Sequence, residues 1–107
     1  MSRPLTLRLT DTAEADLAEI WAYVALEASE TTATRLLDKI KDACEPFRHF
    51  PLSGAAREQF APGLRAGFVG NYVIYYRPDE RELIIVRVLH GARDAAALAE
   101  RGGSAEG

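Results

Sequence analysis

The sequence predicts an α+β fold in which two helices cover one face of an antiparallel sheet. The first half of the chain carries two amphipathic helical patterns separated by a polar break. The second half carries three apolar stretches rich in β-branched and aromatic residues. A short alternating stretch precedes the helices. Because a helical stripe and a sheet face both need apolar cover, we expect the helices to pack on the sheet.

The length and composition predict a single domain spanning residues 1–107. The chain has 107 residues, of which 48% are hydrophobic and 27% are charged, as is typical of one compact core. We expect an ordered core over about residues 4–99 and a flexible polar tail over residues 100–107. Cys44 is the only cysteine, so an internal disulfide and a cysteine-cluster zinc site are excluded, and Cys44 is expected in the core.

The sequence also indicates a cytoplasmic protein with no membrane partner. The N-terminus lacks the apolar segment of a secretory signal, and no run of about 18 apolar residues occurs. A single unpaired cysteine suits a reducing compartment.

The first strand and helix are predicted from alternation and capping. Residues 5–9 alternate apolar and polar side chains, which predicts a strand with one buried face. Asp11 as N-cap and Glu14 three residues later fit a capping box, and the helix is expected to run to about Ala28. The expected buried stripe is Leu17, Ile20, Trp21 and Val24, and the expected solvated acidic face is Asp16, Glu19 and Glu27.

The second helix is predicted after a polar break at residues 29–32. Its apolar positions are Ala33, Leu36, Leu37, Ile40, Cys44 and Phe47. Pro46 removes one helical hydrogen bond, so a kink or an end is expected within residues 42–45. Two short helices with such a break predict an antiparallel hairpin. Pro51 and Gly54 then mark a loop.

Three strands are predicted over residues 64–69, 71–77 and 82–89. Gly70 and Asn71 fit a tight hairpin turn, and Pro78, Asp79 and Glu80 mark a second turn. These connections predict a three-stranded antiparallel meander. A short C-terminal helix is expected over residues 94–100.

The charge balance of the chain argues against direct binding to nucleic acid. The formal net charge is −3, and the N-terminal half carries the acidic excess. Binding to a phosphate backbone normally needs a strong basic excess, so direct sequence-specific DNA binding is not expected. The basic side chains of residues 46–99 are all arginines, which leaves room for a local cluster.

Catalytic, cofactor and metal sites are not predicted. The phosphate-loop, dinucleotide, zinc-protease and nucleophile-elbow motifs are all absent. His49 and His90 lie in different elements without metal-ligand spacing. Glu14 and Glu19 are expected to be a cap and a solvated side chain instead of a catalytic pair.

Arg87 is the unusual residue of the last strand. Strict alternation places Ile84, Val86, Val88 and His90 on one face and Leu83, Ile85, Arg87 and Leu89 on the other. An arginine on an apolar face must be paired or reach solvent. It can extend past its neighbours or pair with Asp94 or Glu82. Alternatively, Arg65, Arg87 and Arg93 gather with His90 as a site for a phosphate or a carboxylate.

The tyrosines of the middle strand leave two interpretations open. Tyr72, Tyr75 and Tyr76 could stack on bases, but tyrosines in strands more often pack against helices.

Several strings resemble the ParE branch of the RelE/ParE toxin superfamily. They are FPLSGAAR (50–57), the pair Leu64-Arg65, VGNYVIYYR (69–77) and IIVRVLHGARD (84–94). The likeness covers about residues 4–99. It implies the element order β-α-α-β-β-β and the toxin of a bacterial toxin-antitoxin pair, with the growth-arrest and plasmid-stabilisation roles of such pairs.

The superfamily implies two alternative activities. ParE-like members poison DNA gyrase and so block replication, whereas RelE-like members cut mRNA in the ribosome with a lysine-rich and arginine-rich site near the last strand. This chain has no tyrosine after its last strand, has only Lys39 and Lys41 as lysines, and is acidic overall. These departures from the RelE-like pattern favour the gyrase poison. The alternatives are a ribosome-dependent endoribonuclease, with His90 as its acid, and a toxin-like protein that only binds an antitoxin.

The resemblance also implies a ParD-like antitoxin that wraps a disordered segment around the toxin in a hetero-oligomeric complex. The candidate surfaces are the outer face of the helical hairpin, the edge of the sheet and the arginines, which acidic antitoxin side chains can neutralise. The candidate residues for target or antitoxin contact are Arg57, Arg65, Arg77, Arg87, His90 and Arg93.

Overall fold

The computed structural model describes residues 3–91 and confirms the α+β prediction. Within that range the elements are β1 (Thr6–Leu9), α1 (Asp11–Glu27), α2 (Glu30–Ala43), α3 (Glu45–His49), the 3₁₀ turn η1 (Pro51–Ser53), β2 (Ala55–Ala56), β3 (Arg65–Val69), β4 (Tyr72–Pro78) and β5 (Glu82–His90). The predicted C-terminal helix and tail lie outside the described residues. Across residues 3–91, no helix has the length and apolar character that crossing a membrane requires.

The strands form one sheet in the order β1-β5-β4-β3-β2. The predicted meander is confirmed as β3, β4 and β5, each antiparallel to the next. β1 joins this meander parallel to β5. The short strand β2 pairs with β3 in a stretch that was predicted to be a loop. Two residues are too few to show alternation, which is why β2 could not be predicted.

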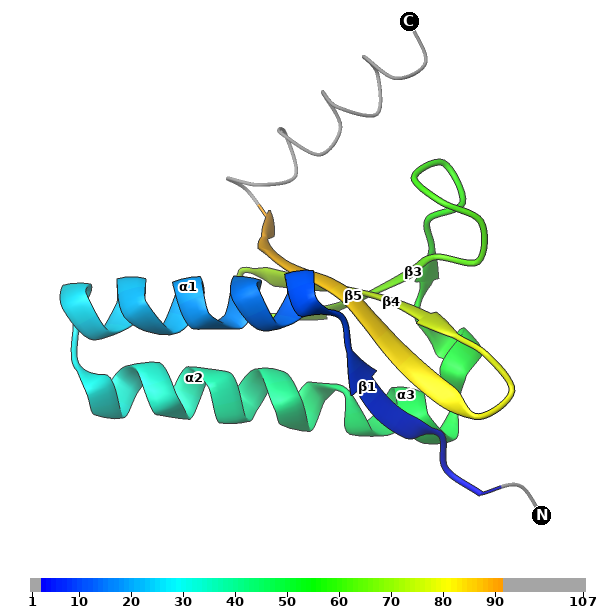
Figure 1. The fold of residues 1–107 in the computed structure, drawn as a ribbon, viewed down its shortest axis with the longest axis horizontal. Coiled ribbons are helices and arrows are strands. Elements are labelled where there is room, and N and C mark those ends of the chain that lie inside the picture. The colour runs from blue at the N-terminus through cyan, green and yellow to red at the C-terminus, as the bar shows by residue number, and fades with distance from the viewer. Residues whose placement is uncertain (1–2, 92–107) are drawn as a thin grey trace, which may run out of the picture.

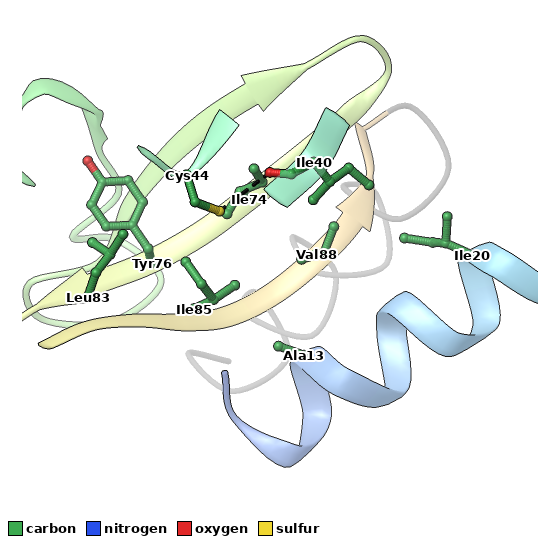
Figure 2. Close-up of a cluster of buried hydrophobic side chains, with 9 residues drawn as sticks. All are labelled: Ala13, Ile20, Ile40, Cys44, Ile74, Tyr76, Leu83, Ile85 and Val88. Carbon is green, nitrogen blue, oxygen red and sulfur yellow. Dashed lines mark hydrogen bonds between the residues drawn. The ribbon is translucent and has the colours of Figure 1, made fainter. Parts of the chain in front are cut away.

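The helices α1 and α2 form an antiparallel hairpin that packs on one face of the sheet (Figure 1). Helices and strands contribute to the same buried cluster, which Figure 2 shows. Cys44 belongs to it, as predicted, and its thiol donates to the carbonyl of Ile40. Burial raises the pKa of the Cys44 thiol to about 11, so the thiol stays protonated and poorly reactive at neutral pH.

A second, smaller core covers the opposite face of the sheet. Phe60 and Ala61, from the loop between β2 and β3, pack there against buried residues of β3, β4 and β5. Phe60 meets the ring of Tyr75 edge-on at 6.1 Å between centroids. Tyr75 and Tyr76 are both buried. Tyr76 packs against Phe47 of the helix α3, as predicted, whereas Tyr75 packs against the loop residue Phe60 and not against a helix.

The start of α1 differs from the predicted capping box. The N-cap is Thr10, whose hydroxyl accepts a hydrogen bond from the N–H of Ala13 at 3.0 Å. The same hydroxyl donates to the carbonyl of Val86 at 2.9 Å. Asp11 is therefore the first helical residue, and its prediction as N-cap is wrong. The contact with β5 selects Thr10, and no local sequence signal reports such a contact.

The other helix boundaries agree with the predictions. α1 ends at Glu27, and Ser29 caps α2 by accepting from the N–H of Thr32. α2 ends at Ala43, and Pro46 lies in the first turn of the separate helix α3. A proline is tolerated there because the first helical N–H groups have no intrahelical acceptor.

The turns of the meander also agree with the predictions. Gly70 has a φ of 56°, a left-handed conformation that glycine adopts without strain. At the second turn, the Asp79 carboxylate accepts from the N–H groups of Arg81 and Glu82. These two backbone hydrogen bonds lower the pKa of Asp79 below its ordinary value.

β5 contains a bulge that the alternation argument missed. Its register against β4 shifts once, which leaves Val86 as an extra residue. After the bulge, Val88 lies in the same core cluster as Ile85, whereas Leu89 lies in the cluster on the opposite face. The predicted grouping of Leu89 with Ile85 on one face is therefore wrong.

Candidate partner-binding surfaces

Arg87 on β5 is bound by Asp16 on α1. The Nε and Nη2 atoms of Arg87 donate to Oδ2 and Oδ1 of Asp16, both at 2.9 Å. The N–H of Val88 also donates to Oδ2 of Asp16, at 3.0 Å. Arg87 is therefore paired, as one interpretation of the sequence predicted, but its partner is Asp16. Of the two predicted partners, Glu82 takes part in another ion pair, and Asp94 lies outside the described residues.

The prediction that Asp16 lies on a solvated acidic face is wrong. Asp16 is only 7% exposed. It follows Ala13 by three residues and precedes Ile20 by four, and both of these are buried, so helical spacing places Asp16 on the buried stripe. The position of Arg87 within an apolar strand was the sequence signal that a buried carboxylate lies opposite it.

Arg65 on β3 is engaged by the turn that follows α3. Its Nη1 donates to the carbonyls of Leu52 and Gly54 at 3.0 and 2.7 Å. The Tyr76 hydroxyl donates to the carbonyl of Pro51 at 2.8 Å and accepts from the N–H of Gly54 at 2.9 Å. Burial raises the pKa of Tyr76, so its hydroxyl keeps the proton that it donates. Arg65 and Tyr76 together fix the conformation of this turn.

Arg57 and His90 each contact an aromatic ring. Nη1 of Arg57 donates to the carbonyl of Ala56, and its guanidinium lies 5.9 Å from the ring centroid of Phe68. This is the range of a cation–π contact. The His90 ring, at the end of β5, packs edge-on against Tyr72 at 5.3 Å between centroids.

The described residues do not bring the predicted arginines into one cluster. Arg65 and Arg87 lie on strands that flank β4, and they bond to different partners. Arg77 is exposed on β4, and Arg93 lies outside the described residues. The side chains of Asp16 and Glu19 line the hollow of about 240 Å³ beside Arg87. Arg87 also lines this hollow but is paired with Asp16, so Glu19 gives the lining a net negative charge, which disfavours phosphate binding there.

An apolar groove lies between β1, the helical hairpin and β5. Its volume is about 380 Å³. Four half-buried leucines line it, Leu7 and Leu9 from β1 and Leu17 and Leu37 from the helices. Its floor is formed by the core residues Ile40, Cys44, Ile85 and Val88, which Figure 2 shows between α2 and β5. The exposed residues Asp38 and Lys41 place a charge of each sign at its rim.

The position of this groove was not predictable from the residue pattern. A leucine that faces a groove and a leucine that faces the core occupy the same stripe of a helix, so periodicity does not separate them. The groove adjoins β1, the outermost strand on that side of the sheet. An apolar groove beside a strand edge can take up an amphipathic helix or an extended segment.

Within residues 3–91, no three His, Cys, Asp or Glu side chains are close enough together to hold a metal ion. The absence of a cofactor stays a prediction.

Comparison with known proteins identifies related sequences. The family model described as the ParE toxin of the type II toxin-antitoxin system parDE matches residues 7–95. Toxin ParE1 of Caulobacter vibrioides is 31% identical over 90 residues, which cover 84% of this chain and 93% of that protein. Toxin ParE3 of the same organism is 28% identical over 82 residues, 77% of this chain and 82% of that protein.

Two solved structures share the fold. The chromosomal ParDE system from P. aeruginosa matches with a TM-score of 0.71 and 23% identity, covering 83% of this chain and 98% of that chain. The toxin-antitoxin complex RelBE2 from Mycobacterium tuberculosis matches with a TM-score of 0.56 and 25% identity, covering 82% and 99%. The structural likeness is therefore greater to the ParDE protein than to the RelBE2 protein.

Proposed function

Because the chain belongs to the ParE family of toxins of type II toxin-antitoxin systems, we propose that it poisons DNA gyrase in the cytoplasm and that a ParD-like antitoxin neutralises it. The toxin stabilises the complex in which gyrase has cleaved DNA, and replication stops. The antitoxin occupies the apolar groove between β1, the helical hairpin and β5.

The groove is the observation that supports antitoxin binding. It holds four half-buried leucines and opens onto core residues, so a segment that covers it removes apolar surface from water. A disordered segment needs such a surface, since apolar burial must offset the entropy that the segment loses when it folds. Asp38 and Lys41 at the rim orient the segment by pairing with its charges.

The hydrogen bonds of Arg65 and Arg87 favour a gyrase poison over a ribonuclease. Cleavage of RNA needs an acid, a base and cations that hold the developing charge on phosphorus. Asp16 binds the guanidinium of Arg87, and turn carbonyls bind that of Arg65. These two arginines have structural partners, and the chain carries a net charge of −3.

Pulse labelling of growing cells distinguishes the two activities. After the toxin is induced, we expect incorporation of labelled thymidine to stop before incorporation of labelled methionine, because a gyrase poison blocks replication forks directly. Coexpression of the cognate antitoxin should restore both. If methionine incorporation stopped first and mRNA were cut in translating ribosomes, the ribonuclease alternative would replace this proposal.

A further inference from the structure

Two large apolar side chains are exposed on the turn that follows α3. Phe50 is 69% exposed and Leu52 is 68% exposed, and only Pro51 separates them. We call residues 50–54 the apolar turn. Exposure of one apolar residue is ordinary, but two on one short turn form a candidate contact site.

Hydrogen bonds fix the main chain of the apolar turn. The Phe50 N–H donates to the carbonyl of Pro46, and Ser53 donates to the Phe50 carbonyl through both its N–H and its hydroxyl. Tyr76 and Arg65 bond to the main chain of the remaining residues, as described above. Each of the five residues thus has at least one main-chain group in a hydrogen bond.

The packing beneath the turn is tight. A Cβ placed on Gly54 would lie 2.2 Å from the Tyr76 hydroxyl oxygen. The Tyr76 ring stacks on Phe47 at 4.6 Å between centroids, and a Cβ on Gly67 would lie 2.4 Å from the Phe47 ring. A rigid support lowers the conformational entropy that Phe50 and Leu52 lose on binding.

The shape of the turn indicates what kind of partner it fits. Exposed side chains on a rigid turn need a preformed apolar pocket, which a folded protein provides and a disordered segment does not. The apolar groove has the opposite shape, and no residue of the apolar turn lines it. The turn therefore fits the folded target of the toxin, and the groove fits the antitoxin segment.

We propose that Phe50 and Leu52 insert into an apolar pocket of the protein that the toxin inhibits. This inference rests on the proposed function, in which the chain acts on a folded protein target and is neutralised by a separate segment.

The test replaces both side chains in the variant Phe50→Gln/Leu52→Gln. Because both are exposed, the variant should unfold at the temperature of the wild-type protein. We expect the variant to need at least about 30-fold more folded protein for the same growth arrest, because loss of two buried interface residues has effects of this size. Its affinity for the cognate antitoxin should stay within about twofold of the wild-type value.

The chain offers a matched control. Phe68 is 61% exposed on β3 and Leu26 is 84% exposed on α1, so Phe68→Gln/Leu26→Gln makes the same chemical change at two other exposed positions. This control should arrest growth at the wild-type dose. A further variant, Tyr76→Phe, removes the two hydrogen bonds that the Tyr76 hydroxyl makes to the turn and leaves Phe50 and Leu52 in place. It should raise the required dose of folded protein by a smaller factor.

The outcomes separate this proposal from the proposed function. If Phe50→Gln/Leu52→Gln arrested growth at the wild-type dose, or lost antitoxin affinity together with toxicity, the role of the apolar turn in target binding would be overturned. If the wild-type chain arrested growth without trapping cleaved DNA on gyrase, the gyrase assignment would fail, and the same growth comparison would still decide the role of the turn.

Discussion

Replacement of Asp16 by alanine is expected to destabilise the protein by about 3 kcal/mol. The variant leaves the Arg87 guanidinium and the Val88 N–H without the carboxylate that accepts three hydrogen bonds from them. We use the lower end of the range for buried pairs because the Arg87 side chain is 30% exposed. The melting temperature should fall by roughly 15 °C in a domain of this size.

Thermal and denaturant unfolding of two further variants test this explanation. Glu19→Ala removes an exposed carboxylate from the same helix and should change stability by less than about 0.5 kcal/mol. Asp16→Ala/Arg87→Met removes both charges of the pair and should be more stable than Asp16→Ala, because the charge that Asp16 balances is removed together with Asp16. Equal losses for Asp16→Ala and Glu19→Ala would show that the ion pair contributes little.

Replacement of Leu37 by aspartate is expected to weaken antitoxin binding by about 100-fold. Leu37 lines the apolar groove and is half-buried, so the variant places a charge where an apolar antitoxin side chain packs. Isothermal titration of the folded variant with the cognate antitoxin measures the change. Leu37 also packs against the core, so toxicity is compared at equal amounts of folded protein. At equal folded dose the variant should keep its toxicity, because the apolar turn is unchanged.

A charge reversal at the rim of the groove avoids any change to the core. Lys41→Glu should weaken antitoxin binding by roughly tenfold, because an acidic antitoxin side chain loses its partner. Lys39→Glu is the matched control, since Lys39 is an exposed lysine of the same helix that does not line the groove. Equal effects of the two variants would point to net charge as the cause and would argue against the groove as the antitoxin site.

Local signals predicted most of the fold. Pro46 predicted the end of α2, which falls at Ala43, and Gly70 takes the positive φ that its turn requires. The period of the apolar residues identified α1, α2 and all three strands of the meander. Each of these signals lies within a few residues of the feature that it predicts, which is why one sequence was sufficient.

The errors have non-local causes. Thr10 caps α1 because its hydroxyl also bonds to β5, and the bulge at Val86 depends on how β5 pairs with β4. Asp16 and Arg87 are 71 residues apart in the chain. The odd position of Arg87 indicated that a partner exists, but only the packing of α1 on β5 identifies that partner. The apolar groove likewise depends on how β1, the helical hairpin and β5 pack together.

The most direct test of the toxin assignment uses purified components. The protein is mixed with DNA gyrase, supercoiled plasmid and ATP, and linear plasmid covalently bound to gyrase is quantified after denaturation. We expect this trapped DNA to accumulate with toxin dose and to disappear when the cognate antitoxin is added first, but to persist when the toxin carries Leu37→Asp. Absence of trapped plasmid at toxin concentrations that stop growth would contradict the proposal that this chain poisons gyrase.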